Sequence, residues 1–305
     1  MSRSQSPKLY SRAAARAAGL PVRILLGREF QKVLYDQYVS ARVPIDLRLR
    51  AQAALNVSPP GACISHHTAA AIWGALPPAT SAVHVRQQTA SGRSVRQGVQ
   101  AHYGRRAPAA TTRNGLPITT PEQTFLDLAA AGLTLVELVI VGDGLVKAKA
   151  TTVERLVAAA SEATGSRHRL ARRAACLVRD GVDSPMETRL RLLLVLAGLP
   201  EPTVNVIVRG REGEWLRRFD LCYTVLRLVV EYDGRQHAED TRQWVTDIDR
   251  REELDRGRYR LVVVSRDGIY VEPERTLVRV RDALTDCGAA DVPRRFSPEW
   301  RRHFA

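Results

Sequence analysis

Long apolar runs are missing from this sequence of 305 residues. A membrane-spanning helix needs about 18 or more consecutive apolar residues, and every apolar segment here is interrupted earlier by charge or glycine. The N-terminal stretch MSRSQSPKLYSRAAARAAG also has no apolar signal-peptide core. We therefore expect a cytoplasmic protein.

Cysteine is scarce, and no two cysteines are closely spaced. The four cysteines are Cys63, Cys176, Cys222 and Cys287. Because no CxxC spacing occurs, the sequence argues against a zinc site and gives no disulfide framework.

Lysine is the rarest charged residue, since the chain has only Lys8, Lys32, Lys147 and Lys149, and none follows position 149. Lys and Arg together still exceed Asp and Glu by 46 to 32, which gives a net charge of +14 carried almost entirely by arginine. This excess favours a polyanionic partner such as nucleic acid. Codon bias in a GC-rich genome, which also explains abundant alanine, is the alternative interpretation.

The length allows two or three domains, and the first half predicts an α+β region. A helix follows Ser65 in CISHHTAAAIWGALPP, and another follows Thr120, where Pro121 and Gln123 complete a capping box. Adjacent helical positions do not face each other, so His66 and His67 are poor partners for one metal ion. Further helices are expected up to about residue 18 and over residues 46–55, 135–147, 151–160 and 168–178. Strands are expected within residues 22–43, 82–86 and 95–103.

Two segments of this half carry a family resemblance. The succession ISHHTAAAIWGALPP, a β segment and LPITTPEQTFLDLAA resembles the middle region of actinobacterial proteins related to the AbiEi-type antitoxins of type IV toxin–antitoxin systems. Those proteins usually begin with a winged helix-turn-helix, which residues 10–38 match only in part, without a clear second recognition helix. The resemblance implies a winged-helix-like region over 1–60, an AbiEi-like region over 61–180 and a toxin as a possible protein partner.

The second half predicts a different order of elements. In DSPMETRLRLLLVLAGLP, Ser184 caps a helix, Pro185 takes its first position and Glu187 closes a capping box. A strand over 204–208 and a hairpin with strands 215–223 and 226–232 follow, then a helix in WVTDIDRREELDRG and an apolar strand over 259–265. The expected fold class is α/β, with the order helix, three-strand meander, helix, strand.

Acidic residues cluster at the end of that hairpin. Alternate residues of a strand share a face, so Glu231 and Asp233 point the same way, and the hairpin brings Asp220 alongside them. Carboxylates that close repel one another unless they are protonated or bridged by a cation, and hard oxygen ligands suit Mg²⁺ or Mn²⁺. The pattern therefore predicts a metal site.

The words SPMETRLR, RRFDL, VVEYDGRQH and DIDRREELDRGRYRLVVVS resemble the PD-(D/E)XK nucleases, in particular the restriction-endonuclease-like domain akin to the very-short-patch (Vsr) mismatch endonucleases. The likeness covers about residues 181–285, within an expected domain 181–290 that precedes a basic tail 291–305. It implies that Asp220, Glu231 and Glu187 bind metal and that Asp233 stands where the usual motif has lysine.

In place of that lysine, His237 is the candidate general base, with Gln236 a weaker one, while a hydrogen-bonded turn residue is the competing role for His237. Arginine forks bind phosphates in a bidentate way, so Arg217, Arg218, Arg250 and Arg251 are candidate DNA contacts, with a solvated basic face as the alternative.

Three functions follow from these observations. The first is a Mg²⁺-dependent DNA endonuclease, in repair or phage defence. The second is a DNA-binding regulator or antitoxin whose nuclease fold is inactive. The third is a partner-binding protein that neutralises a toxin.

Overall fold

The computed structural model describes residues 7–88, 96–104, 107–209, 215–234 and 259–304. The chain divides into two compact units, each with its own hydrophobic core. Unit 1 comprises Met1–Leu133 and Glu154–Arg172, and unit 2 comprises Thr134–Val153 and Arg173–Ala305. Within the described ranges, no helix has the length and apolar character needed to cross a membrane.

Unit 1 begins with two short helices and a two-stranded hairpin. They are α1 (Arg12–Ala17), α2 (Val22–Leu25), β1 (Phe30–Leu34) and β2 (Gln37–Ser40). The expectation of short strands within 22–43 is confirmed by β1 and β2 and was wrong over α2, where the turn that follows the N-cap residue Pro21 is helical. Leu25 packs with Ala15 and Tyr38 in a small core that joins the helices to the hairpin.

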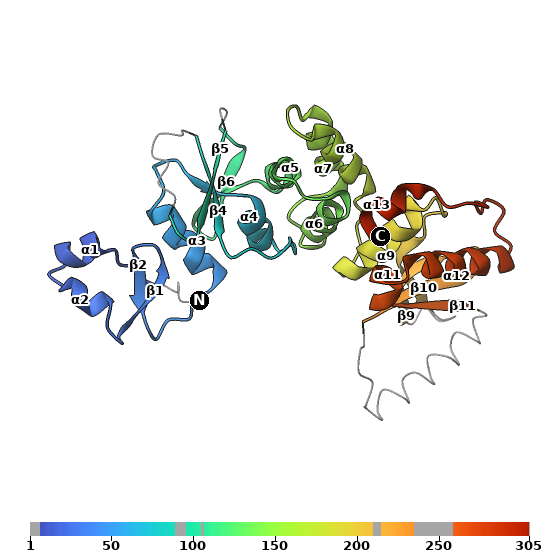
Figure 1. Cartoon of the computed structure of the whole chain (residues 1–305), viewed down its shortest axis with the longest axis horizontal. Coiled ribbons are helices and arrows are strands. Elements are labelled where there is room, and N and C mark those ends of the chain that lie inside the picture. Colours follow the sequence, from blue (N-terminus) through green and yellow to red (C-terminus); the bar gives the residue numbers. More distant parts are fainter. Residues whose placement is uncertain (1–6, 89–95, 105–106, 210–214, 235–258, 305) are drawn as a thin grey trace, which may run out of the picture. The chain divides into compact units, whose positions relative to one another are not determined.

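A mixed five-stranded sheet forms the centre of unit 1, in the order β5-β4-β3-β7-β6. Its core includes Ile64, Val85, Ile118 and Phe125, all fully buried. Helices α3 and α4 pack against this sheet, as Figure 1 shows. The elements are α3 (Leu47–Asn56), β3 (Cys63–Ile64), α4 (His66–Trp73), β4 (Val83–Gln87), β5 (Val99–Tyr103), β6 (Ala110–Arg113), β7 (Leu116–Thr119), α5 (Pro121–Ala131), α7 (Val153–Glu162) and α8 (His168–Leu177), with α8 continuing into unit 2.

The helix starts of unit 1 follow the sequence, although two caps differ in detail. Thr120 caps α5 through the backbone N–H of Gln123, but the Gln123 side chain donates to Asp127 at 2.8 Å and does not close the box. Ser65 stands at the N-cap of α4 without accepting a capping hydrogen bond. Its hydroxyl pairs instead with Nδ1 of His66 at 2.9 Å.

Unit 2 is built on a four-stranded sheet in the order β11-β10-β9-β8. In chain order, its strands β8, β9 and β10 form an antiparallel meander, and β11 is parallel to β10. Helices α9 and α12 pack on β10, burying Val230 and Leu193 completely. The elements are α6 (Leu135–Lys147), α9 (Pro185–Leu196), β8 (Thr203–Arg209), β9 (Trp215–Tyr223), β10 (Leu228–Asp233), β11 (Arg260–Ser265), α11 (Arg266–Tyr270), α12 (Pro273–Asp286), the 3₁₀ helix η1 (Pro298–Trp300) and α13 (Arg301–Phe304).

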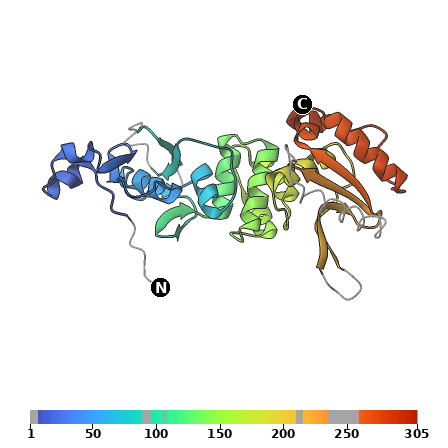
Figure 2. The ribbon, with the colours of Figure 1, turned by 90° about the horizontal axis from the view of Figure 1, so that it is seen from below.

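The predicted hairpin is confirmed, with a longer turn than expected. The turn covers residues 224–227, and Arg227 adopts a φ of +50°, so β10 starts at Leu228 and not at Leu226. β9 pairs with β10 only over Leu221–Tyr223, whereas β8 and β9 pair along most of their length. Figure 2 shows β8 and β9 extending together beyond the rest of the sheet. The helix expected in WVTDIDRREELDRG lies outside the described residues.

A buried ion pair joins α6 to α9. The guanidinium of Arg191 is fully buried and donates to Asp143 at 3.1 Å, and Asp143 also accepts from the hydroxyl of Thr188 at 2.8 Å. Glu201 takes a second hydrogen bond from Arg191 at 3.0 Å. Because a buried charge is costly without a partner, α6 is part of the core of unit 2.

The basic C-terminal segment ends in packed structure. Trp300 and Phe304 are buried, and the N–H of Ser297 donates to the carbonyl of Ala197 at the end of α9, at 2.9 Å. The last two elements, η1 and α13, therefore contribute apolar side chains to the core of unit 2.

Candidate metal and nucleic-acid site in unit 2

The β9–β10 hairpin places two carboxylates at adjoining positions. Its pairing runs to Val230 opposite Leu221, and the next residue along each strand is Glu231 in β10 and Asp220 in β9. Glu231 is 6% exposed, so its carboxylate is largely removed from water. Asp233 follows Glu231 by two residues on the same strand, so strand alternation sets both on one face.

Glu187 lies in the first turn of α9 and has two structural partners. Ser184 accepts from the backbone N–H of Glu187 at 3.2 Å, and the Glu187 carboxylate accepts from the N–H of Asp183 at 2.9 Å. The second contact falls one residue before the N-cap, so the predicted capping box is modified. Burial raises the pKa of Glu187, and the nearby charge of Asp220 raises it further. The carboxylates of Glu187 on α9 and Asp220 on β9 thus lie near enough to influence each other.

Asp183 lies beside Glu187 and pairs with two basic side chains. Its carboxylate pairs with Lys147 of α6 at 3.1 Å and with Arg218 of β9. Burial opposes ionisation of Asp183, but hydrogen bonds from Lys147 and Asn205 and the charge of Arg218 hold its pKa below the usual range. Arg218 and Lys147 are each about half exposed, at 48% and 50%, so both cations also reach solvent.

Lys147 is the residue that the sequence argument missed. No lysine follows position 149, yet α6 belongs to unit 2. Its Lys147 contacts Asp183, which lies 36 residues later in the sequence. Its ammonium also donates to the backbone carbonyl of Asp183 at 2.6 Å. No local motif marks this contact, because α6 precedes the expected domain boundary near residue 181.

The donor set fits a hard divalent cation in part. Among the described residues, no three side chains of His, Cys, Asp or Glu are placed to hold a metal ion together. Mg²⁺, however, usually binds through only one or two carboxylates and retains several waters and substrate phosphate oxygens. The adjoining positions of Asp220 and Glu231 suit binding of Mg²⁺ through two carboxylates. Glu187 lies near enough to Asp220 to affect the charge at this place.

Several predicted site residues fall outside the described part of the chain. They are His237, Gln236, Arg250, Arg251 and the side chain of Arg217. Their roles as general base and as phosphate contacts stay predictions. Arg218 is described, and its exposed guanidinium beside Asp183 leaves it able to meet a phosphate.

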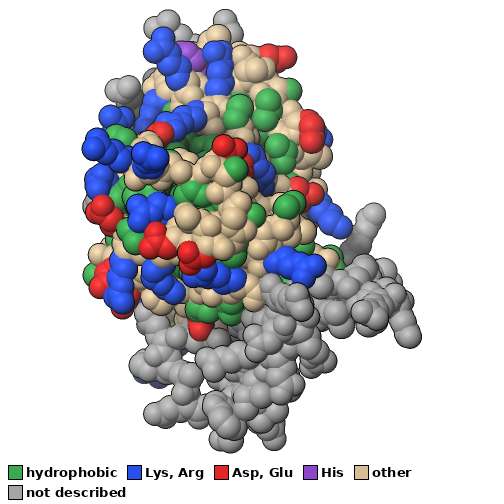
Figure 3. All heavy atoms as spheres, turned by 90° about the vertical axis from the view of Figure 1, so that its right-hand side faces the viewer, with side chains coloured by type: hydrophobic (Ala, Val, Ile, Leu, Met, Phe, Trp, Pro, Cys, Tyr) green, Lys and Arg blue, Asp and Glu red, His purple; other side chains and the backbone are tan. Residues whose placement is uncertain are grey.

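Charges of both signs are interspersed on unit 2. Figure 3 shows Lys and Arg side chains beside Asp and Glu side chains on the viewed face, with apolar groups between them. Exposed arginines here form ion pairs, such as Arg260 with Asp286 at 2.7 Å and Arg301 with Glu274 at 3.1 Å. Positive and negative side chains are therefore mixed on the described part of the viewed face.

Unit 1 contains a histidine cluster that the sequence did not predict. His66 stacks on His102 with ring centroids 3.5 Å apart, and Nδ1 of His84 lies 2.9 Å from Nε2 of His102. Adjacent His66 and His67 both approach His84, at centroid distances of 6.0 and 4.6 Å, because His66 has a φ of +50°. Burial is the main cause that lowers the pKa of His66 to about 2, and of His84 and His102 to about 4. These three rings are therefore neutral at pH 7.

Comparison with known proteins gives relatives without an assigned activity. No protein-family model matches the chain. Two curated proteins of Mycobacterium tuberculosis, uncharacterized protein MT2308 (strain CDC 1551 / Oshkosh) and uncharacterized protein Rv2248 (strain H37Rv), are each 27% identical over 258 residues, which is 82% of this chain and 90% of theirs. The crystal structure of the RV2827C protein from the same species aligns with a TM-score of 0.39 and 16% identity, over 68% of this chain and 85% of that one.

Proposed function

We propose that the protein is a metal-dependent DNA endonuclease whose site lies where α9, β9 and β10 meet. The observation that carries this proposal is the placement of Asp220 and Glu231 at adjoining positions on neighbouring strands, with the buried Glu187 close enough for Asp220 to raise its pKa. The resemblance to Vsr-like PD-(D/E)XK nucleases, on four ordered words, supports the same assignment.

Each residue has a separate part in this proposal. Asp220 and Glu231 would hold a Mg²⁺ or Mn²⁺ ion, which when bound polarises a phosphate oxygen and acidifies a water. Glu187, largely buried with a raised pKa, would orient that water through a hydrogen bond. Asp233 occupies the place of the usual lysine, and His237 would take the proton. Arg218, together with Arg217, Arg250 and Arg251, would bind phosphates, since a guanidinium fork matches their geometry.

The test is nicking of supercoiled plasmid by the full chain with Mg²⁺ or Mn²⁺. Asp220→Asn keeps the shape of the side chain and removes its charge, so we expect nicking to fall by about 100-fold or more, in line with the loss of several kcal/mol of charge stabilisation. Asp282→Asn is the matched control, because Asp282 is an exposed acid of α12 that pairs with Arg281. EDTA should abolish cleavage by the wild type.

The alternative function is a DNA-binding regulator of an antitoxin type. The observation that favours it is the N-terminal order α1, α2, β1, β2, two helices followed by a hairpin, in a chain of net charge +14. If folded wild-type protein binds duplex DNA without a metal ion and leaves plasmid, linear and single-stranded DNA uncut, the endonuclease proposal fails and the regulator replaces it. A copurifying small protein would point to toxin neutralisation instead.

A further inference from the structure

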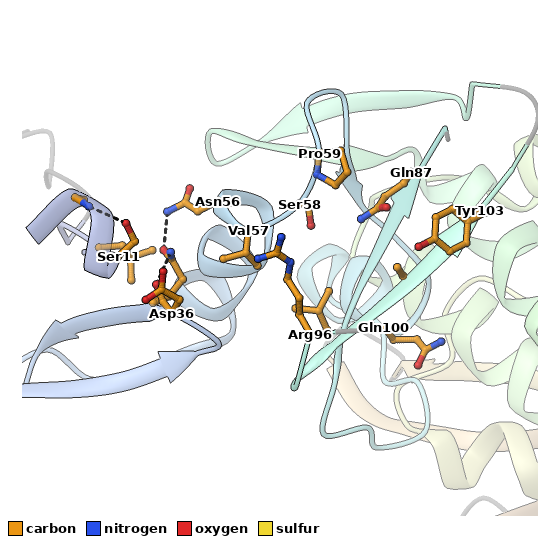
Figure 4. Close-up of a pocket in the computed structure, with 15 residues that line it drawn as sticks. Ser11, Asp36, Asn56, Val57, Ser58, Pro59, Gln87, Arg96, Gln100 and Tyr103 are labelled. Carbon is orange, nitrogen blue, oxygen red and sulfur yellow. Dashed lines mark hydrogen bonds between the residues drawn. The ribbon is translucent and has the colours of Figure 1, made fainter. Parts of the chain in front are cut away.

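A pocket of about 1000 Å³ opens in unit 1, well away in sequence from the carboxylates of unit 2. It is lined by α1, β2, the C-terminal end of α3, and the strands β4 and β5. Figure 4 shows Ser11, Asp36 and Asn56 on one side of it and Gln87 and Tyr103 on the other. Small-molecule sites usually have volumes of about 300–1,000 Å³, so the pocket has room for a ligand of nucleotide size.

One wall of the pocket is a fixed hydrogen-bond network. Asn56 donates to Oε1 of Gln37 at 3.0 Å, and Gln37 donates to the carbonyl of Asp36 at 2.8 Å. The other end of the Asn56 amide accepts from Gln52 at 3.1 Å. These contacts hold β2 to α3, so this side of the pocket is formed before any ligand arrives.

The opposite wall contains a buried acceptor that has no donor. Gln87 is 7% exposed and lines the pocket, and its buried Oε1 receives no hydrogen bond from the part of the chain that the structure describes. A buried carbonyl oxygen without a donor destabilises a fold, so such an atom requires an explanation. An N–H group of a ligand in the pocket would satisfy it.

Two further groups define the chemistry of that ligand. Gln87 is paired with Tyr103 in the parallel β4–β5 register, so both side chains lie on the same face, and Tyr103 is 40% exposed. An exposed tyrosine ring is a stacking surface for a flat heterocycle. Arg96 also lines the pocket, with its guanidinium 5.6 Å from the ring centroid of Tyr35, and brings a positive charge to it.

We infer that this pocket binds one nucleotide. The base stacks on Tyr103 and donates an N–H to Oε1 of Gln87, and the phosphate pairs with Arg96. Planar ring, N–H donor and phosphate are the three features that the pocket matches together, and a nucleotide is the common ligand class that carries all three. The nucleotide can be free or part of a single strand, and the net charge of +14 favours a strand.

The experiment measures binding of the full chain to fluorescein-labelled single-stranded oligonucleotides by anisotropy, without metal ions. We expect an oligonucleotide with abasic sites to bind at least about 5-fold more weakly than its normal counterpart, because stacking is lost. Tyr103→Ala should weaken binding of the normal strand by a similar factor, whereas Tyr270→Ala, which removes another half-exposed tyrosine in unit 2, should not.

Gln87→Met separates binding from stability. Methionine has a similar volume and no acceptor, so the variant loses the ligand contact, about 5-fold in affinity, while the fold loses an unsatisfied oxygen together with the amide nitrogen. Weaker binding with an unchanged or higher melting temperature therefore supports the proposal. Equal affinities of wild type, Tyr103→Ala and Gln87→Met, or equal affinities for normal and abasic strands, would overturn it.

Competition by free nucleoside monophosphates identifies the source of the nucleotide. If they displace the strand at similar concentrations per nucleotide, the pocket takes a small molecule. If only strands compete, it takes a unit of a single-stranded nucleic acid. Because no cleavage is measured, this result is independent of Asp220 and of the endonuclease proposal.

Discussion

At the residue scale, Glu187 combines a role in the fold with a proposed role at the site. Its carboxylate accepts from the N–H of Asp183 at 2.9 Å, which helps to start α9, and burial raises its pKa. A structural carboxylate and a site carboxylate make different demands, because the first needs only an acceptor oxygen and the second needs a charge.

Glu187→Gln tells these two roles apart. The amide keeps an acceptor oxygen for Asp183 and removes a charge that burial penalises, so we expect the free energy of unfolding at pH 7 to be equal or slightly higher. If the charge of Glu187 serves the metal site, nicking activity should fall by about 10- to 100-fold, as when supporting groups around a metal are removed. Unchanged nicking in a normally folded variant would restrict Glu187 to capping.

Residue patterns in the sequence could predict Asp220 and Glu231 but not Lys147. The two acids come from a strand periodicity that is local and strongly marked, so a shared face follows once the hairpin is recognised, but their adjoining positions depend on the longer turn at residues 224–227. The contact of Lys147 with Asp183 depends on how α6 packs against α9, which no local pattern encodes. Contacts that depend on how whole helices pack can be identified only from the folded structure.

At the scale of elements, the β3–α4 turn holds the histidine cluster together. Ser65 pairs with His66 instead of capping the helix, and the positive φ of His66 directs its ring onto His102. Sequence reasoning placed His66 and His67 correctly on a helix start, and it missed their shared neighbour His84. In an ideal helix the two rings diverge, but the backbone here is irregular because His66 has a φ of +50°.

The stability of unit 1 should fall in weak acid. An unfolded histidine has a pKa of about 6.5, and burial lowers that of His84 and His102 to about 4 in the folded state. Protons therefore bind the unfolded chain more tightly, so stability is complete above pH 6.5 or so and is lost as the pH falls toward 4, by at most about 1.4 kcal/mol per pH unit for each ring.

Urea midpoints measured at several values between pH 7 and pH 4.5 test this expectation. His102→Phe keeps an aromatic ring against His66 and removes one titrating group, so its midpoint should depend less on pH. His168→Gln is the control, since His168 begins α8 outside the cluster and its ring forms a hydrogen bond with the carbonyl of Gly165 at 2.8 Å. An identical pH dependence in His102→Phe and wild type would disprove the role of the cluster.

At the scale of the whole molecule, neither unit is a continuous stretch of chain. Unit 2 takes Thr134–Val153 from within the sequence of unit 1, and Asp143 on that segment is the buried partner of Arg191. The change of sequence pattern indicates a boundary near residue 181. Caps and periodicity identify each helix by itself and do not show which unit the helix joins. Membership of α6 in unit 2 depends on a pair 48 residues apart.

A fragment of residues 181–305 should therefore fail to fold, although it contains every element of the four-stranded sheet. Without α6, Arg191 loses its buried partner Asp143 and keeps Glu201, which is 34% exposed, and α9 loses the helix that packs against it, a loss comparable with the stability of a small domain. A fragment of residues 134–305 restores the pair and should unfold cooperatively in urea. Circular dichroism of both fragments decides, and a cooperative transition in the shorter one would show that α6 is dispensable.

The separation of Asp143 from Arg191 also has a consequence during synthesis on the ribosome. The acid is made 48 residues before the arginine that neutralises it, and at about 5–20 residues per second this gap lasts on the order of 2–10 s. Throughout that interval the apolar face of α6, with Leu138 and Leu145, is translated and still lacks α9. A nascent chain of this protein thus carries an incomplete helix pair for several seconds, during which its apolar face is open to a chaperone.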